Sequence, residues 1–205
     1  WANVWCSQYK FLILHRTLFI SRMAKQIEAS TDQEFEQVMA ECRSLFAKKL
    51  ADYGASWRLL RPASLTDQLL IKAKRIRSLE IKGQSLVGEG IRPEFIALIN
   101  YGIVGLIQLD RGFADHVDIS ADDALKLYDS HAAEALALMQ RKNHDYDEAW
   151  RLMRVSSYTD FILTKIERVK EIEDNRGCTI VSEGIASNYM DIINYAVFGA
   201  IKLAQ

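Results

Sequence analysis

The chain has 205 residues, 49% of them hydrophobic, and its formal net charge at pH 7 is −1. This apolar content excludes an intrinsically disordered protein, and the balanced charge argues against direct binding to nucleic acid. The three cysteines are widely spaced and form no CxxC pair, which is typical of a reduced, cytoplasmic protein rather than a disulfide-bonded one.

The first 22 residues differ in composition from the rest of the chain. Their apolar stretch, residues 11–20, is interrupted by His15 and Arg16 and is too short to span a bilayer, so no membrane association is expected. We interpret residues 1–22 as a leader outside the domain, with Met23 as the natural start. A genuine N-terminal helix is the alternative interpretation.

The remainder of the chain contains the same pattern twice. The stretch KKLADYGASWRLLRPASLTD begins at Lys48, and KNHDYDEAWRLMRVSSYTD, which begins at Lys142, repeats its Asp-Tyr, Trp-Arg-Leu and Thr-Asp elements in order. The tripeptides EGI and INY follow in both copies, beginning at Glu89, Ile99, Glu183 and Ile193. This self-similarity predicts two tandem copies of one unit, residues 23–112 and 113–205, which together form one compact domain.

Each copy reads as three helical segments, which we expect to begin near residues 31, 64 and 93 in the first copy and near 120, 157 and 187 in the second. Ser120 opens a capping box with Asp123, and the Ser and Thr of the two Ser-x-Thr-Asp runs are interpreted as N-caps. The third segment of each copy is apolar almost all round. The sequence therefore predicts an all-α bundle of two pseudo-symmetric copies.

A set of cations persists at matching positions of the two copies, although packing of the bundle does not explain it. The set consists of Lys49, Arg58, Arg61, Lys72 and Arg75 in the first copy and Lys142, Arg151, Arg154, Lys165 and Arg168 in the second. Arg and Lys side chains in such a set are suited to binding phosphate. The alternative is that they form internal ion pairs with the repeated acids, among them Asp67 and Asp160.

Polar side chains also interrupt the apolar third helices. Asn100 and Asn194 need hydrogen-bond partners there, and Asp191 lies one turn before Asn194 on the same helix face. Together with Asn194 and with Glu183 in the preceding loop, Asp191 forms a candidate Mg²⁺ site. A buried hydrogen-bond network is the alternative.

The first copy has Glu89 at the position of Glu183 but Ala97 at the position of Asp191. We therefore expect the second copy to be the better equipped for metal. The aromatic residues Tyr146 and Trp150 could stack on a base, although anchoring of a loop against the bundle is the favoured interpretation.

The motifs K-x-x-DYG-x-x-W, S-x-T-D-x-x-x-x-K-x-x-R, EGI and INY resemble the DUF1599 family, also called nucleotide modification associated domain 1. The resemblance covers nearly everything from Met23 onward, in both copies. It implies a nucleotide or another phosphorylated small molecule as ligand, and homodimerisation stays open.

The ending SEGIASNYMDIINYAVFGAIKL is similar to the metal-binding helix of all-α nucleoside triphosphate pyrophosphohydrolases of the MazG-like and dUTPase-like group. This second resemblance implies that Glu183 and Asp191 are catalytic and bind Mg²⁺, with Asp160 as the nearest substitute for the family's further acids. We therefore expect a magnesium-dependent nucleotide-processing enzyme. The alternative is a non-catalytic module that binds a nucleotide or a partner protein, so whether the chain is an enzyme stays open.

Overall fold

Two apolar helices, one from each copy, cross at the centre of the larger of two units. The computed structural model describes residues 31–86, 88–181 and 183–205. It divides into residues 1–34, of which 31–34 are described and helical, and residues 35–205, which contain both sequence copies. The predicted leader, residues 1–22, lies outside the described residues.

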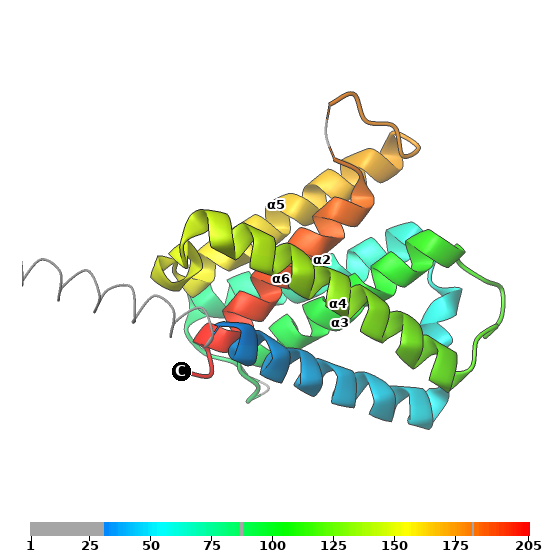
Figure 1. Cartoon of the computed structure of the whole chain (residues 1–205), viewed down its shortest axis with the longest axis horizontal. Helices are drawn as coiled ribbons and strands as arrows, with labels where there is room; N and C mark the ends of the chain where they lie inside the picture. The colour runs from blue at the N-terminus through cyan, green and yellow to red at the C-terminus, as the bar shows by residue number, and fades with distance from the viewer. Residues whose placement is uncertain (1–30, 87, 182) are drawn as a thin grey trace, which may run out of the picture. The chain divides into compact units, whose positions relative to one another are not determined.

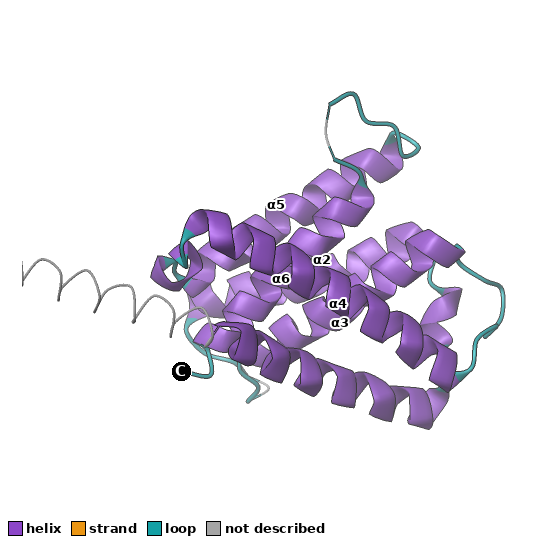
Figure 2. Ribbon diagram, viewed as in Figure 1, coloured by secondary structure: helices purple, strands orange, loops and turns teal. Residues whose placement is uncertain are grey.

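The larger unit is helical throughout, and no strand occurs in the described ranges (Figure 2). Residues 35–53, here called the leading helix, are followed by a 3-10 turn and two long helices. A second helix, turn and pair of helices then repeat this order (Figure 1). The elements are η1 (Ser56–Leu59), α2 (Pro62–Lys82), α3 (Arg92–Arg111), α4 (Ala121–Tyr146), η2 (Ala149–Leu152), α5 (Val155–Asp174) and α6 (Ile185–Lys202). The all-α tandem arrangement predicted from the sequence is confirmed.

The ends of the helices follow local sequence signals in most cases. Ser120 caps α4 as predicted, because its side chain accepts a hydrogen bond from the backbone N–H of Asp123 at 3.1 Å. Pro62 opens α2, where a missing N–H costs nothing. Gly83 ends α2 in the left-handed conformation, with φ of 72°.

The predicted caps of α2 and α5 are wrong. Both helices begin earlier than expected, after Arg61 and Arg154, and neither start carries a side-chain cap bond. Thr66 and Thr159 lie inside the helices and are buried, because their hydroxyls have partners in the other copy.

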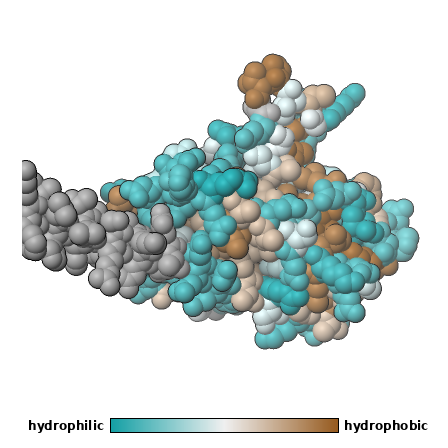
Figure 3. Space-filling model, in the orientation of Figure 1, coloured by the Kyte–Doolittle hydropathy of each residue, from teal (hydrophilic) through white to brown (hydrophobic). Residues whose placement is uncertain are grey.

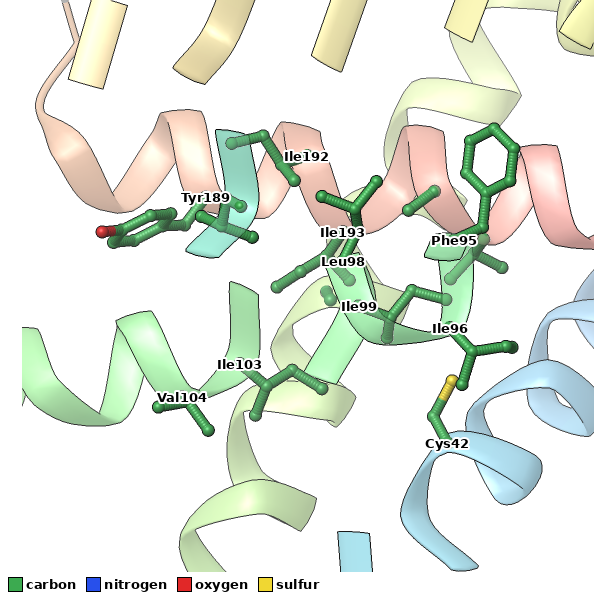
Figure 4. Close-up of a cluster of buried hydrophobic side chains, with 14 of the residues drawn as sticks. Cys42, Phe95, Ile96, Leu98, Ile99, Ile103, Val104, Tyr189, Ile192 and Ile193 are labelled. Carbon is green, nitrogen blue, oxygen red and sulfur yellow. The ribbon is translucent and has the colours of Figure 1, made fainter. Parts of the chain in front are cut away.

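The core centres on the contact between α3 and α6, the most extensive in the unit. Figure 4 shows Phe95 of α3 and Tyr189 of α6 among the buried aliphatic side chains of these helices. A Cβ atom placed on Gly105 would lie 2.8 Å from the ring of Tyr189, and one on Gly199 would lie 2.7 Å from the ring of Phe95. These two contacts are equivalent in the repeat, so the copies pack with pseudo-two-fold symmetry.

The other helices surround this central pair. The α2 helix packs against α3 and α5, and α5 packs against α6, so α2, α3, α5 and α6 form one closed group. The α4 helix contacts both α3 and α6. Among the described residues, no helix is both long and apolar enough to cross a membrane.

Candidate functional site

Each copy encloses one pocket between its helices and its 3-10 turn. The first pocket, about 460 Å³, is lined by the leading helix, η1, α2 and α3. The second pocket, about 340 Å³, is lined by α4, η2, α5 and α6. Matching residues occupy the two walls, namely Lys49, Tyr53, Trp57, Asn100 and Tyr101 in the first pocket and Lys142, Tyr146, Trp150, Asn194 and Tyr195 in the second. The repeated sequence pattern therefore corresponds to a repeated pocket.

In the second copy a buried carboxylate is shared by two lysines, one of which lines the second pocket. Asp191 is about 5% exposed, and its two oxygens lie 2.5 Å from Lys142 Nζ and 2.6 Å from Lys165 Nζ. Burial opposes ionisation of Asp191, but the hydrogen bonds and charges of the two lysines outweigh it and lower the pKa of Asp191. Asp191 is therefore an ionised internal partner of two lysines.

The first pocket lacks this carboxylate. Ala97 stands at the position of Asp191 and lines the wall. Lys49, the counterpart of Lys142, is exposed at the wall and has no ion-pair partner in the part of the chain that the structure describes. The Lys49 ammonium group is thus free to meet a ligand.

A different carboxylate partly balances the first pocket. Glu94 is buried, with Lys72 Nζ 3.2 Å from its Oε2 atom and the Arg75 guanidinium bound to its Oε1 atom. Lys49, Lys72 and Glu94 line this pocket. Its lining cations therefore outnumber its lining carboxylate, whereas in the second pocket the lining charges of Lys142 and Asp191 cancel.

The two tryptophans differ in how their rings are covered. Trp150 stacks on Phe198 with ring centroids 4.5 Å apart and planes 10° from parallel, a contact of the kind that the anchoring interpretation expects. Val104 stands at the position of Phe198 in the first copy. Trp57 meets Phe46 instead, at 6.3 Å and with a tilt of 37°. The first pocket is the larger of the two, and both indoles are buried, Trp57 being about 9% exposed and Trp150 about 6%.

The indole N–H groups differ in the same direction. Trp150 Nε1 donates to Glu148 Oε2 at 3.0 Å. Ala55 occupies the position of Glu148 in the first copy, and the buried Nε1 of Trp57 finds no acceptor within the described ranges. The first copy thus lacks two carboxylates that the second copy uses internally.

At the equivalent residues Asn100 and Asn194, it is instead the second copy that lacks internal hydrogen-bond partners. Asn100 donates to the carbonyl oxygen of Cys42 at 3.3 Å and accepts from the Tyr128 hydroxyl at 2.8 Å, so it belongs to a buried hydrogen-bond network. Asn194 is buried, and neither its Nδ2 nor its Oδ1 atom has a partner among the described residues.

Arg58 is a correction to the predicted phosphate set. Its side chain is about 1% exposed, and its Nε atom lies 2.7 Å from Asp118 Oδ1. It also donates to Gln108 and to the carbonyl oxygen of Gly112. Arg58 therefore ties η1 to the segment after α3 and is not available to a ligand. Its counterpart Arg151 binds Glu148 at 2.8 Å and lies over the Trp150 ring.

Other predicted residues lie away from the two pockets. Arg61 and Arg154 are exposed immediately before α2 and α5, Asp67 is exposed on α2, and Glu89 lies 3.4 Å from Arg75. They do not line either pocket.

The three carboxylates predicted to bind magnesium are each engaged elsewhere. Asp160 binds Arg77 of α2, Glu183 accepts a hydrogen bond from Ser187, and Asp191 is held by its lysines. Across residues 31–86, 88–181 and 183–205, no group of three or more His, Cys, Asp and Glu side chains is placed to hold a metal ion. The donor set as arranged does not fit magnesium, and the magnesium site stays a prediction.

A third hollow, about 820 Å³, lies between the end of α5 and the start of α6. Lys165, Arg168 and Glu183 line it, whereas Asp160 does not. Figure 3 shows a hydrophobic tip on the loop that joins these helices, where Ile180 and Val181 are exposed. Some of the predicted second-copy residues therefore line this hollow and others line the second pocket, whereas Arg151, Arg154 and Asp160 line neither.

Several pocket residues escaped the sequence prediction. Tyr101 and Tyr195 were visible in the repeated INY motif, but Phe161 and Phe198 have no repeated partner of their kind. Gln108 lines neither pocket but binds three backbone carbonyl oxygens around η1 at 3.0–3.3 Å, and this role gave no signal in the sequence.

Comparison with known proteins supports the first family resemblance. The family described as nucleotide modification associated domain 1 (DUF1599) matches residues 49–109 and 142–203, which is more than half of the chain. No curated protein and no solved structure matches the chain. The resemblance to all-α pyrophosphohydrolases is not confirmed by these comparisons. The chain therefore belongs to the nucleotide modification associated domain 1 family and carries two copies of that domain in tandem.

Proposed function

We propose that the protein binds a nucleotide in the first pocket. The observation that carries this proposal is the exchange of Asp191 for Ala97 at equivalent positions of the two pockets. In the second pocket a carboxylate supplies the negative charge between two lysines. In the first pocket a ligand phosphate would supply that charge to Lys49, beside Lys72, which Glu94 already partly balances.

The rest of the wall suits the base and the sugar. Tyr53, Trp57 and Tyr101 provide aromatic surface, and stacking of a base on such side chains is worth about 1–3 kcal/mol. The pocket volume, about 460 Å³, falls within the range typical of small-molecule sites. Lysine contributes a compact point charge, which suits a phosphate group at the pocket mouth.

In this proposal the contacts to the phosphate come from the lysine ammonium groups that line the pocket. Hydrolysis of the nucleotide stays a prediction from the second resemblance. A non-catalytic nucleotide-binding module is the function that the described geometry supports best.

The test is isothermal titration with nucleoside mono- and triphosphates in the presence of EDTA, on the wild type, Lys49→Ala and Lys48→Ala. Lys48 is the exposed neighbour of Lys49 and does not line the pocket, so it is the matched control. We expect one ligand per first pocket, a loss of about tenfold or more in affinity for Lys49→Ala, and no change for Lys48→Ala.

Absence of nucleotide binding, or an equal effect of the two lysine variants, would overturn the proposal. Repeating the titration with Mg²⁺ while following pyrophosphate release tests the enzyme alternative in the same samples. If the wild type releases pyrophosphate and the Asp191→Ala variant does not, the result would support the predicted hydrolase instead.

A further inference from the structure

The second pocket contains a buried amide with unused hydrogen-bonding capacity. Asn194 is about 5% exposed, lines the pocket, and leaves both Nδ2 and Oδ1 unpaired within the described residues. Buried polar groups in native proteins are nearly always hydrogen-bonded. Both amide atoms of Asn194 are closed to solvent in the free chain, so a ligand supplies these partners when the side chain turns toward the pocket that Asn194 lines.

The repeat explains why this amide is unpaired. Asn100, its counterpart, accepts a hydrogen bond from the hydroxyl of Tyr128. The residue that occupies the position of Tyr128 in the other copy is Phe35, which has no hydroxyl to donate. The polar position was thus kept in both copies, while the internal partner is present in only one.

The surroundings of Asn194 select against a charged ligand. The charged lining residues, Lys142 and Asp191, form an ion pair at 2.5 Å, and Lys165, the second lysine on Asp191, does not line the pocket. Most of the remaining wall is aromatic, with Tyr195, Phe161 and Phe198 among the lining residues. A pocket of about 340 Å³ with this wall is at the lower end of the range for small-molecule sites and fits a flat, mostly apolar guest.

We propose that the second pocket binds an uncharged nucleobase or nucleoside, with the Asn194 amide on the edge of the base. A primary amide presents a donor and an acceptor side by side, which complements the adjacent donor and acceptor on a base edge. The aromatic side chains cover the faces of the ring. This site is separate from the proposed nucleotide site, so one chain carries two sites that differ in their preference for charge.

The test is titration of the whole chain with adenosine, uridine and their 5′-monophosphates, monitored by isothermal titration and by ligand-observed NMR. The variants are Asn194→Leu and Asn194→Ser. Leucine is close to asparagine in size and has no amide, and serine has a single hydroxyl in place of the adjacent amide donor and acceptor. We expect the second pocket of the wild type to bind a nucleoside at least as tightly as it binds the corresponding 5′-monophosphate. In both variants the affinity for the nucleoside should fall by about tenfold or more.

Thermal unfolding provides a readout that needs no ligand, with Asn100→Leu as the matched control. Asn194→Leu removes an unpaired amide, so its Tm is expected to equal or exceed that of the wild type. Asn100→Leu leaves the Tyr128 hydroxyl without its acceptor, so its Tm is expected to fall by about 2 °C or more.

The proposal is overturned if no nucleoside binds the wild type, or if binding is unchanged in Asn194→Leu and Asn194→Ser. It is also overturned if Asn194→Leu lowers the Tm as much as Asn100→Leu does, because a bound water would then already satisfy the amide. The Lys49→Ala experiment tests the first pocket and the Asn194 variants test the second. Failure of the nucleoside proposal therefore leaves the proposed nucleotide site to its own test.

Discussion

Thr66 in α2 donates its hydroxyl hydrogen bond to Glu173 in α5 at 2.8 Å, and the repeat reproduces this bond with the helices exchanged. Thr159 in α5 donates to Glu80 in α2 at 2.9 Å. Each bond joins one copy to the other, and all four residues are at equivalent positions of the two copies. The repeated Thr and Glu residues therefore hold the interface between copies rather than capping helices or binding a ligand.

This pair of bonds predicts a dependence of stability on pH. Burial raises the pKa of Glu80 and of Glu173, and the threonine hydrogen bonds only partly offset it. Because protonation is easier in the folded than in the unfolded state, these groups favour folding below their ordinary pKa of 4.5, and that contribution is lost as the pH rises through the raised values. In the double variant Glu80→Gln/Glu173→Gln, which cannot titrate at these positions, we expect this fall in the free energy of unfolding with rising pH to be absent.

The measurement is the free energy of unfolding by urea for both proteins from pH 4.5 to 7. The difference between the variant and the wild type should grow with pH. Asp118, whose pKa the hydrogen bond from Arg58 lowers to about 2, contributes stability that is lost as the pH falls toward that value, so it does not interfere in this range. A difference that stays constant with pH would show that the two glutamates titrate normally.

The crossing of α3 and α6 predicts a cost for any side chain at Gly105. A methyl group there would lie 2.8 Å from the ring of Tyr189, which is itself about 2% exposed, so the buried ring would have to shift. Gly105→Ala is expected to lower the free energy of unfolding by about 1–3 kcal/mol, even though alanine favours the helix. Gly90→Ala, where a Cβ meets nothing within 4 Å, is the control and should unfold like the wild type. Equal stability of the two variants would contradict the close packing of the copies.

The assignment of Arg58 to the scaffold predicts a larger effect on stability than on ligand binding. Arg58→Ala leaves the Asp118 carboxylate and the Gln108 amide without their partner, and we expect a loss of about 3 kcal/mol in the free energy of unfolding. Arg151→Ala, at the equivalent position but more exposed, should cost less. Urea unfolding of the two variants checks this order. A stable Arg58→Ala protein with impaired nucleotide binding would restore Arg58 to the phosphate set.

The helices could be predicted from the sequence because their signals are local. The 3.6-residue periodicity, the Ser120 cap and the repeated motifs each act within a few residues of the chain. The roles of Thr66 and Arg58 could not be predicted in this way. Their partners, Glu173 and Asp118, are distant in the sequence and meet them only in the folded bundle.

The candidate site was predicted in composition but not in arrangement. The exchange of Asp191 for Ala97 was visible in the sequence and was interpreted as a sign that the second copy is better equipped for metal. The fold places Lys142 and Lys165 on the two oxygens of Asp191, so the same exchange now favours the first pocket for an anion. The direction of the inference depended on which side chains meet, and periodicity alone does not give that information.

The exchange itself can be reversed by mutation, which gives the sharpest prediction. In Ala97→Asp the new carboxylate stands where Asp191 stands in the second copy, close to the lining cations Lys49 and Lys72. We expect nucleotide affinity of the first pocket to fall by about tenfold or more, because the phosphate must now compete with an internal anion. The fold should be retained, since Ala97 is only partly buried at the pocket wall.

Asp191→Ala makes the opposite change and leaves Lys142 and Lys165 next to each other without their shared carboxylate. Repulsion between the two ammonium groups should lower the Tm of the free protein, and a bound phosphate should restore it, because the ligand then replaces the missing anion. Isothermal titration of this variant with a nucleoside monophosphate should show a second phosphate-dependent site that the wild type lacks. The prediction is contradicted if Asp191→Ala gains no second phosphate-dependent site and Ala97→Asp binds nucleotide as tightly as the wild type. In that case the carboxylate at this position does not control the binding of anions to the two pockets.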